Sequence, residues 1–283
     1  KNNPMALLQA PPGAGKSTWL PLTLMQAGHV KRIVMLEPRR LAARNIAQYL
    51  ASLQNEAVGE SVGLRIRGES KISNATKLEI VTEGMLTRML QNDPELSGVD
   101  LLIFDEFHER SIAADTALAF ALETQAALRD DLKILLMSAT LDGERYSEFF
   151  DCPIISSEGR SYPIDEIYVP LKDESRWLED IPAVIKQALN EQTGSALVFL
   201  PGQREILRVK QALNDLADDC EVFTLFGEQN KGEQQAAIAP AQQGKRKVVL
   251  TTNVAETSLT IEGIRIVVDS GKRRAASFNV KHG

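Results

Sequence analysis

Short apolar runs, almost uninterrupted by polar residues, alternate with helical stretches along the first half of the chain. We predict strands at residues 5–9, 32–37, 78–81, 101–105 and 133–137, and a helix at 17–27 between the first two strands. A run such as Leu101-Leu102-Ile103-Phe104 suits a strand that is covered on both faces. The pattern therefore predicts an α/β fold built on a parallel sheet.

A second series of the same kind follows a polar, turn-forming stretch at residues 156–161. We predict strands at 164–169, 196–200, 220–225, 247–252 and 264–269, and helices at 182–190 and 204–216. The chain has 283 residues, enough for two domains that each bury a core of their own. We therefore predict two domains of similar size, residues 1–157 and 158–283.

The composition is that of a soluble globular protein, with 43% apolar and 25% charged residues. No apolar run is long enough to span a membrane and no signal peptide opens the chain, so we expect no membrane partner. Cys152 and Cys220 lie far apart and outside metal-ligand spacing, which favours a reducing cytoplasm. The chain begins at Lys1 rather than Met, almost inside a motif, so we expect a trimmed piece of a longer protein. We also expect a monomer.

A glycine-rich turn between the first predicted strand and the first predicted helix matches the phosphate-binding P-loop. Its two glycines let backbone N–H groups point at phosphate oxygens, and the helix start adds free N–H groups and a positive dipole end. Lys16 can reach the β- and γ-phosphates, and the Ser17 hydroxyl can bind Mg²⁺. The alternative is an incidental turn, with Ala10 in place of the usual leading glycine. The residues of the turn are Ala10, Pro11, Pro12, Gly13, Ala14, Gly15, Lys16 and Ser17.

Two acids, Asp105 and Glu106, end the fourth predicted strand. The carboxyl end of a strand is where a parallel sheet presents residues to its ligand crevice. In a P-loop enzyme an Asp at this place holds Mg²⁺, and an adjacent acid can orient and activate the attacking water. A solvated loop is the alternative for an isolated Asp-Glu pair. The preceding P-loop favours the catalytic interpretation.

Further segments resemble the motifs of the DEAH-box helicases of superfamily two, in the order in which that family carries them. Asp105-Glu106-Phe107-His108-Glu109-Arg110 is similar to motif II, and Ser138-Ala139-Thr140 is similar to motif III. Residues 37–44 and 82–88 resemble motifs Ia and Ib, residues 199–206 resemble motif IV, and residues 251–263 resemble motif V. Phe107 and the segment 261–263 look most like the bacterial HrpB-type branch of ATP-dependent RNA helicases.

The resemblance implies two RecA-like lobes in tandem, of the P-loop NTPase type, that bind and hydrolyse ATP with Mg²⁺ to move along or unwind RNA. Asp105 would position the metal together with Ser17, and Glu106 would position the hydrolytic water. His108 would couple the nucleotide state to the second lobe, although a hydrogen-bonded histidine without that duty is the alternative. The triphosphate would be bound by Gly13, Gly15, Lys16, Ser17 and Thr18, with Glu262 contributing from the second lobe.

The same resemblance places the contacts to nucleic acid on both lobes. Ser138 and Thr140 would link hydrolysis to strand movement, or their hydroxyls would only form local turns. Contacts to the RNA backbone are expected from Arg39, Thr82, Gly84, Thr252 and Asn253. Phosphate and sugar contacts position a strand without reading its sequence, so we expect little base specificity. Arg65, Arg67 and Arg88 are interpreted as surface charges, and a solvated helix start is the alternative for Arg39.

Three departures from the family pattern bear on the mechanism. Tyr49 stands where an arginine usually stacks on the nucleotide base, and no aromatic residue accompanies Gly271-Lys272 as the second stacking partner. Tyr49 could still stack on the base, and the alternative is that it packs within a helix. We therefore expect loose base clamping and poor nucleotide selectivity. The family's arginine-rich motif VI is absent before Gly283, so the second lobe is expected to be truncated. We expect this chain to bind nucleotide but to hydrolyse it slowly, because such arginines contribute roughly 10³–10⁵ in rate in other nucleotide hydrolases.

Two other functions stay open. One is a helicase or translocase directed at DNA, because backbone contacts barely separate DNA from RNA. The other is a nucleotide-gated adaptor that clamps RNA without unwinding it. The formal net charge of −6 argues against binding through bulk electrostatics, although backbone N–H groups and a few arginines can hold phosphates on an acidic protein.

Overall fold

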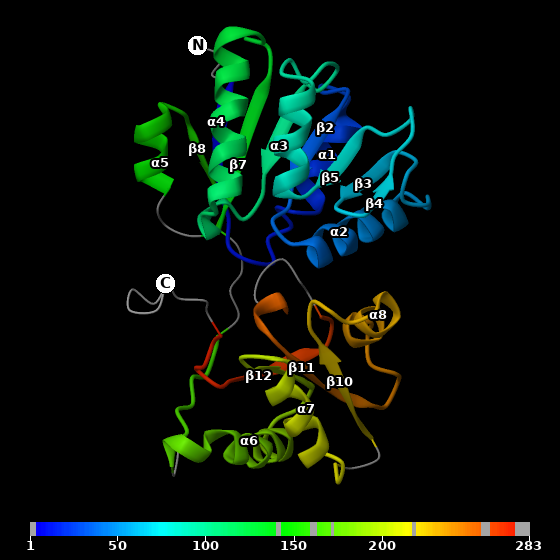
Figure 1. Cartoon of the computed structure of the whole chain (residues 1–283), viewed down its shortest axis with the longest axis vertical. Coiled ribbons are helices and arrows are strands. Elements are labelled where there is room, and N and C mark those ends of the chain that lie inside the picture. Colours follow the sequence, from blue (N-terminus) through cyan, green and yellow to red (C-terminus); the bar gives the residue numbers. More distant parts are fainter. Residues whose placement is uncertain are drawn as a thin grey trace, which may run out of the picture. The chain divides into compact units, whose positions relative to one another are not determined.

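The chain divides into two compact units, Lys1–Pro163 and Ile164–Gly283 (Figure 1). The structure is a computed structural model that describes residues 4–139, 143–158, 163–170, 173–216, 219–255 and 261–274. Each unit has its own sheet and its own hydrophobic core. The predicted domain boundary after residue 157 lies a few residues before this division. The predicted α/β class with parallel sheets is confirmed.

The described residues of the first unit form an eight-stranded sheet with the order β4-β3-β5-β2-β6-β7-β1-β8. Neighbouring strands are parallel, apart from the antiparallel pair of β3 and β4. The five predicted strands are present, with ends that differ by at most one residue. The strands are β1 (Met5–Gln9), β2 (Ile33–Leu36), β3 (Val62–Ile66), β4 (Glu69–Lys71), β5 (Leu78–Val81), β6 (Leu101–Phe104), β7 (Lys133–Ser138) and β8 (Ile154–Ser156).

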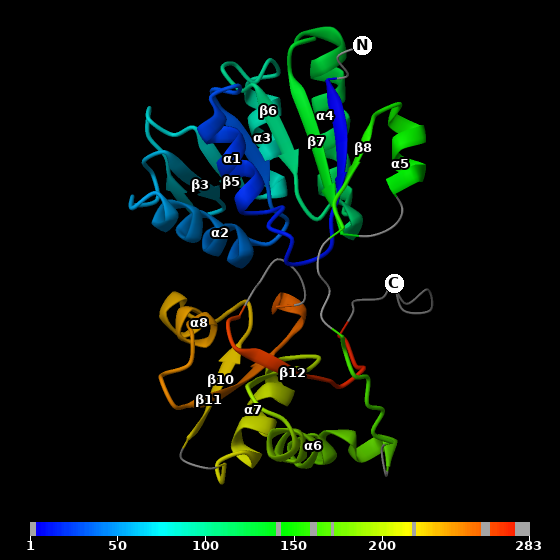
Figure 2. The ribbon, with the colours of Figure 1, turned by 180° about the vertical axis from the view of Figure 1, so that it is seen from behind.

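Helices cover both faces of the first sheet. One face carries α3 (Glu83–Asn92) and α4 (Ile112–Ala127), which lie in front of the sheet in Figure 1. The other carries α1 (Trp19–Ala27) and α2 (Arg40–Leu53), which lie in front in Figure 2. Helix α1 ends at Ala27. The next residue, Gly28, caps it in the left-handed conformation that glycine favours, with a φ of 72°. A further helix, α5 (Gly143–Phe150), packs on β1 and β8.

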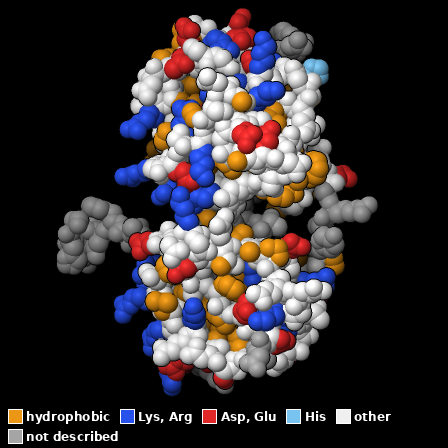
Figure 3. All heavy atoms as spheres, turned by 90° about the vertical axis from the view of Figure 1, so that its right-hand side faces the viewer, with side chains coloured by type: hydrophobic (Ala, Val, Ile, Leu, Met, Phe, Trp, Pro, Cys, Tyr) orange, Lys and Arg blue, Asp and Glu red, His pale blue; other side chains and the backbone are white. Residues whose placement is uncertain are grey.

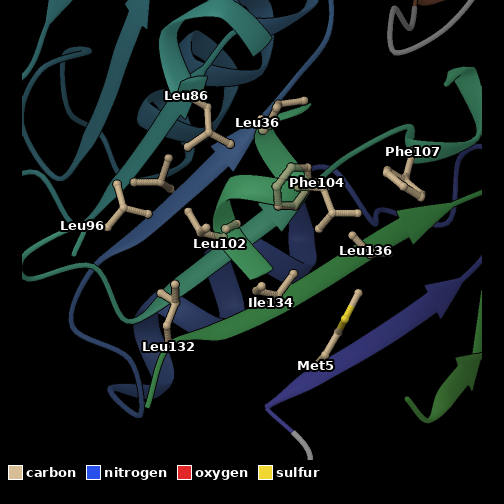
Figure 4. Packing of buried hydrophobic residues seen from close by; sticks show 14 of the residues in the cluster. Met5, Leu36, Leu86, Leu96, Leu102, Phe104, Phe107, Leu132, Ile134 and Leu136 are labelled. Atoms are coloured by element: carbon tan, nitrogen blue, oxygen red, sulfur yellow. The ribbon is translucent and has the colours of Figure 1, made fainter. Parts of the chain in front are cut away.

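The core beneath α3 and α4 reaches the end of β6, where the acidic residues begin. Phe104 is fully buried beside Leu136 of β7, and the ring of Phe107 lies edge-on to the ring of Phe104 with their centroids 6.5 Å apart (Figure 4). Full burial of a side chain of this size stabilises a fold by roughly 1.5–3 kcal/mol. The core therefore anchors the backbone on both sides of Asp105 and Glu106.

The described residues of the second unit form a four-stranded parallel sheet with the order β10-β11-β9-β12. Its core lies mainly between this sheet and the helices α6 and α7. The third helix, α8, packs on β10. The strands are β9 (Ser195–Phe199), β10 (Cys220–Leu225), β11 (Arg246–Thr251) and β12 (Ile264–Asp269), and the helices are α6 (Trp177–Glu191), α7 (Gln203–Ala212) and α8 (Lys231–Ile238).

Three predictions for the second unit were wrong in detail. Residues 163–170 have no regular structure, because no described strand pairs with them, and the side chains of Ile164 and Tyr168 are exposed. Helix α6 begins at Trp177, so Pro182 lies inside the helix rather than at its start. Helix α7 ends at Ala212 and not at residue 216. Apolar content alone does not make a strand, which needs a hydrogen-bonded neighbour.

Candidate active site

The predicted motifs of the first unit follow the carboxyl ends of neighbouring strands. The P-loop follows β1 and the acidic pair follows β6, and β7, which ends at Ser138, lies between these two strands. The strands are parallel and in register, with Gln9 opposite Ser138 and Phe104 opposite Leu136. The carboxyl ends of parallel strands meet at one edge of a sheet, so the fold brings the three motifs together.

Turns, and not helix, form the P-loop. Gly13 and Gly15 both have a φ of 79°, a conformation that side chains disfavour, and the Thr18 N–H donates to the Gly15 carbonyl over 3.2 Å. Helix α1 therefore begins at Trp19, two residues later than predicted. The Ala10 N–H donates to the Ser138 carbonyl over 3.1 Å, which ties the loop to the end of β7. Pro11, Gly15, Ser17 and Thr18 are half-buried, and Pro12, Gly13 and Ala14 are exposed.

Lys16 and the acidic pair meet at this edge. The Lys16 Nζ lies 3.3 Å from the Glu106 Oε1, and both side chains are buried, with 5% and 7% of their surface exposed. The Asp105 Oδ1 accepts a hydrogen bond from the Glu106 N–H over 2.9 Å. Glu106 has a φ of 49°, a left-handed conformation that is costly for a residue with a side chain. That conformation turns the chain abruptly after β6, where the two acids lie beside Lys16.

Burial, and after it the neighbouring Glu106 carboxylate, raise the pKa of Asp105 to about 7. A hydrogen bond with Ser17 and the positive charge of Lys16 act in the opposite direction on the same pKa. The Ser17 hydroxyl and the Asp105 carboxylate, the two groups predicted to hold a metal, are thus within reach of each other. A carboxylate must be deprotonated to bind a metal, so protons and a cation compete for Asp105 near pH 7.

The donor set at this position fits Mg²⁺. The Asp105 Oδ2 is buried and has no hydrogen-bond partner in the structure, which is costly for a carboxylate oxygen unless a cation or a water satisfies it. A carboxylate and a hydroxyl are hard oxygen ligands of the kind that Mg²⁺ binds together with substrate phosphates. Within the described residues, no three His, Cys, Asp or Glu side chains form a metal-binding cluster.

His108 joins the acidic pair to the end of β7. Its Nδ1 accepts a hydrogen bond from the Ala139 N–H at 3.4 Å, and its Nε2 lies 3.3 Å from the Glu106 Oε2. A neutral ring that accepts at Nδ1 carries its proton on Nε2 and donates it toward Glu106. The predicted coupling residue therefore contacts two motifs within the first unit. Ser138 is buried at the end of β7, and its predicted partner Thr140 lies outside the described residues.

The predicted nucleic-acid contacts of the first unit follow two adjacent strands, β2 and β5. The Arg39 Nη2 lies 3.3 Å from each carboxylate oxygen of Glu109, so this arginine is not the solvated charge of the alternative interpretation. Thr82 is buried at the start of α3, whereas Gly84 is exposed. Tyr49 lies on α2 and is 47% exposed, which leaves its ring accessible.

The surface near β3 and β4 is basic although the protein as a whole is acidic. Figure 3 looks onto this side of the first unit, where Lys and Arg side chains gather. A hollow of about 550 Å³ on this side is lined in part by Arg65, Arg67 and Arg88. Arg65 also pairs with the fully buried Glu79, with 2.8 Å between Nε and Oε1. The net charge of −6 is therefore distributed unevenly.

The second unit carries its predicted residues after β11 and before β12. Thr252 is half-buried and Asn253 is exposed in the short 3₁₀ turn Asn253–Ala255. Glu262 is exposed in the turn that precedes β12. Lys272 is exposed beyond β12.

Sequence reasoning missed the side chains that hold the acidic turn in place. The turn is a 3₁₀ helix, Phe107–Glu109, and Glu109 at its end pairs with Arg39. Arg110 donates to Asp115 over 2.8 Å and to the Tyr146 hydroxyl over 3.0 Å, and it lies over the Phe107 ring at 5.5 Å. Ser111 then caps α4 by accepting from the Ala114 N–H. Of these, only the Ser-initiated helix start has a local sequence signal.

A P-loop and an acidic strand end that meet on a parallel sheet define a P-loop nucleoside triphosphatase. The sequence pattern of the DEAD/DEAH box helicases matches residues 1–149, and that of the helicase conserved C-terminal domain matches residues 179–279. The chain belongs to the DEAD/DEAH box helicase family.

Named relatives support the family and its DEAH branch. The chain is 52% identical to the ATP-dependent RNA helicase HrpB of Escherichia coli K12, and the match covers 99% of this chain and 35% of the relative. It is 36% identical to the ATP-dependent RNA helicase HrpA of Borreliella burgdorferi, again over 99% of this chain and 35% of the relative. The crystal structure of the E. coli DEAH/RHA helicase HrpB matches 98% of this chain and 36% of the solved chain, with a TM-score of 0.91. This chain thus spans about a third of the length of these relatives.

Proposed function

We propose that the chain is the ATP-hydrolysing motor of an RNA helicase. The observation that carries the proposal is the buried contact between Lys16 and Glu106, beside Asp105 and Ser17, at the carboxyl edge of the first sheet. RNA is the proposed nucleic acid because HrpB and HrpA, to which the chain is similar over 99% of its length, are ATP-dependent RNA helicases. The two free cysteines agree with a reducing cytoplasm as the place of action.

In the proposed reaction, the N–H groups of the P-loop and the Lys16 ammonium bind the triphosphate of ATP. Lys16 exchanges its contact with Glu106 for phosphate oxygens, which leaves the Glu106 carboxylate able to orient water. The carboxylate takes a proton as the water oxygen bonds to the γ-phosphorus, and the bond to the bridging β–γ oxygen breaks, so ADP and phosphate leave. Asp105 and Ser17 would hold Mg²⁺, which neutralises charge on the phosphates when it is bound.

The remaining residues transmit this chemistry. His108, hydrogen-bonded to the Ala139 N–H, holds Glu106 and links it to the end of β7. Arg39, Thr82 and Gly84 of the first unit, with Thr252 and Asn253 of the second, contact the RNA backbone in this proposal. Glu262 contributes to nucleotide binding from the second unit. Coupling of the two ligands requires that the protein bind each of them with different affinity in its different conformations.

The proposal is tested by nucleic-acid-stimulated ATP hydrolysis by the full-length protein. We expect single-stranded RNA to stimulate turnover more than DNA of the same length and sequence, and we expect a tailed RNA duplex to be unwound only with ATP. Lys16→Ala should abolish both activities. Equal stimulation by DNA would move the assignment to a DNA helicase or translocase. Nucleotide-dependent RNA binding without unwinding would instead indicate the clamping adaptor.

A further inference from the structure

The ion pair between Arg39 and Glu109 joins two parts of the site with different predicted ligands. Arg39 follows β2 at the start of α2, where RNA contact is proposed. Glu109 ends the turn that follows the acidic pair. The Arg39 Nη2 lies 3.3 Å from both Glu109 oxygens, and the two side chains are 21% and 23% exposed. The contact is thus protected in part, yet a ligand from solvent can still reach it.

The turn that carries Glu109 is too short to move independently of Glu106. Its three residues are Phe107–Glu109, and the Glu109 N–H donates to the Glu106 carbonyl over 2.9 Å. Phe107, in the middle, is buried in the core. Glu106 and Arg110, on either side of the turn, have φ values of 49° and 46°. Residues with a side chain adopt this left-handed conformation only where the surrounding structure holds them in it, so both ends of the turn are constrained.

Two residues in and beside this turn have partners at the catalytic edge of the sheet. Glu106 contacts Lys16, and His108 contacts Glu106 and the Ala139 N–H. A change in the position of the Glu109 carboxylate therefore acts on the same short segment that orients the proposed water-activating acid and its histidine. Coupling between sites needs such a contiguous set of contacts that two ligands can bias.

Glu109 and an RNA phosphate have the same charge and seek the same guanidinium. A phosphate that binds Arg39 must share or displace the Glu109 carboxylate, because two anions at one partly buried cation repel each other. We propose that Glu109 is a positioning residue that couples RNA occupancy at Arg39 to the acidic turn, by competing with an RNA phosphate for the Arg39 guanidinium. The inference rests on the proposed function, since it assumes that RNA binds at Arg39.

The competition predicts opposite effects for the two members of one ion pair. Glu109→Gln removes the competing charge and should tighten the binding of a single-stranded oligoribonucleotide in the absence of nucleotide, by roughly 2- to 5-fold, the factor that a partly exposed ion pair supplies. Arg39→Gln removes the RNA contact and should weaken the same binding by about tenfold or more. If the pair only stabilised the fold, both variants would weaken binding, and that result would overturn the proposal.

The second measurement is the factor by which saturating RNA changes the affinity for a nonhydrolysable ATP analogue with Mg²⁺. This factor is reciprocal between the two ligands, so it measures the coupling itself. We expect Glu109→Gln to bring the factor at least halfway to 1 on a logarithmic scale. Asp131→Asn is the matched control: it also removes one negative charge from an ion pair of the first unit, with Arg129, in the turn that precedes the amino end of β7. It should leave both RNA affinity and the factor unchanged.

The outcomes separate this inference from the proposed function. If the unmodified full-length protein neither binds RNA nor shows a coupling factor different from 1, the proposed function fails. If the unmodified protein is coupled and Glu109→Gln is coupled to the same extent, the role of Glu109 is refuted and the proposed function stands. Should the Gln variant unfold, Glu109→Asp, whose shorter side chain withdraws the charge from Arg39, tests the same prediction, and unchanged RNA affinity and coupling in that variant would refute it.

Discussion

Replacement of Glu106 by Gln separates nucleotide binding from hydrolysis. The amide has the shape of the carboxylate but only one acceptor oxygen, so it can keep one of the two contacts with Lys16 and His108, which each lie 3.3 Å from one Glu106 oxygen. It cannot take a proton from water. Loss of a positioned general base lowers rates by typically 10²–10⁴-fold, which corresponds to roughly 3–5 kcal/mol in the activation free energy. We expect a loss of this size in the hydrolysis step.

Nucleotide binding should be at least as tight in Glu106→Gln as in the unmodified protein. Lys16 then no longer has to leave a carboxylate in order to bind phosphate, and one negative charge near the triphosphate is removed. Single-turnover hydrolysis measures the chemical step, and titration with a fluorescent ATP analogue measures binding. Hydrolysis within about threefold of the unmodified rate, which is far below the effect of a lost base, would refute the assignment of Glu106.

Two further predictions concern a titration and a buried charge. Asp105 has a pKa of about 7 in the metal-free protein, so protons compete with Mg²⁺ below that pH, and affinity for Mg²⁺–ATP should be about tenfold weaker at pH 6 than at pH 8. Asp105→Asn, measured in parallel, corrects for titration of the nucleotide, and an unchanged slope in this variant would contradict the prediction. Lys247 is buried and donates hydrogen bonds to two carbonyls at the end of α8, that of Ala237 over 2.6 Å and that of Ala239. Lys247→Met should therefore lower the free energy of unfolding of the second unit, measured in urea, by about 2–3 kcal/mol. Lys245→Met, which breaks the partly exposed pair with Glu221, should cost less than about 1 kcal/mol, and equal losses in the two variants would contradict the assignment.

The strands that end at the site could be predicted from the sequence because they are continuous apolar runs. The bounds of β1 are those predicted, β6 ends one residue before its predicted end, and β7 ends one residue after it. Strand β3 was missed because Gly63 and Arg65 interrupt its apolar pattern. The structure explains the glycine: a Cβ at position 63 would lie 2.7 Å from the Thr76 Cγ2, so the neighbouring chain leaves no room for a side chain.

The convergence of Lys16, Asp105 and Glu106 could also be predicted, because parallel strands fix which edge their carboxyl ends share. Contacts made by long side chains between distant segments could not. Arg39 and Glu109 are 70 residues apart, and neither position has a local pattern that indicates its partner. The conformations of Glu106 and Arg110 are likewise imposed by packing around Phe107, since residues with a side chain disfavour positive φ.

The central claim is that one triphosphate and its metal are held between the P-loop and the acidic strand end. The most direct test is calorimetric titration of the full-length protein with a nonhydrolysable ATP analogue, with and without Mg²⁺. The account predicts that Mg²⁺ strengthens binding to the unmodified protein, that Asp105→Asn loses this strengthening, and that Lys16→Ala loses tight binding in both conditions. Full dependence on Mg²⁺ in Asp105→Asn, or tight binding by Lys16→Ala, would contradict it.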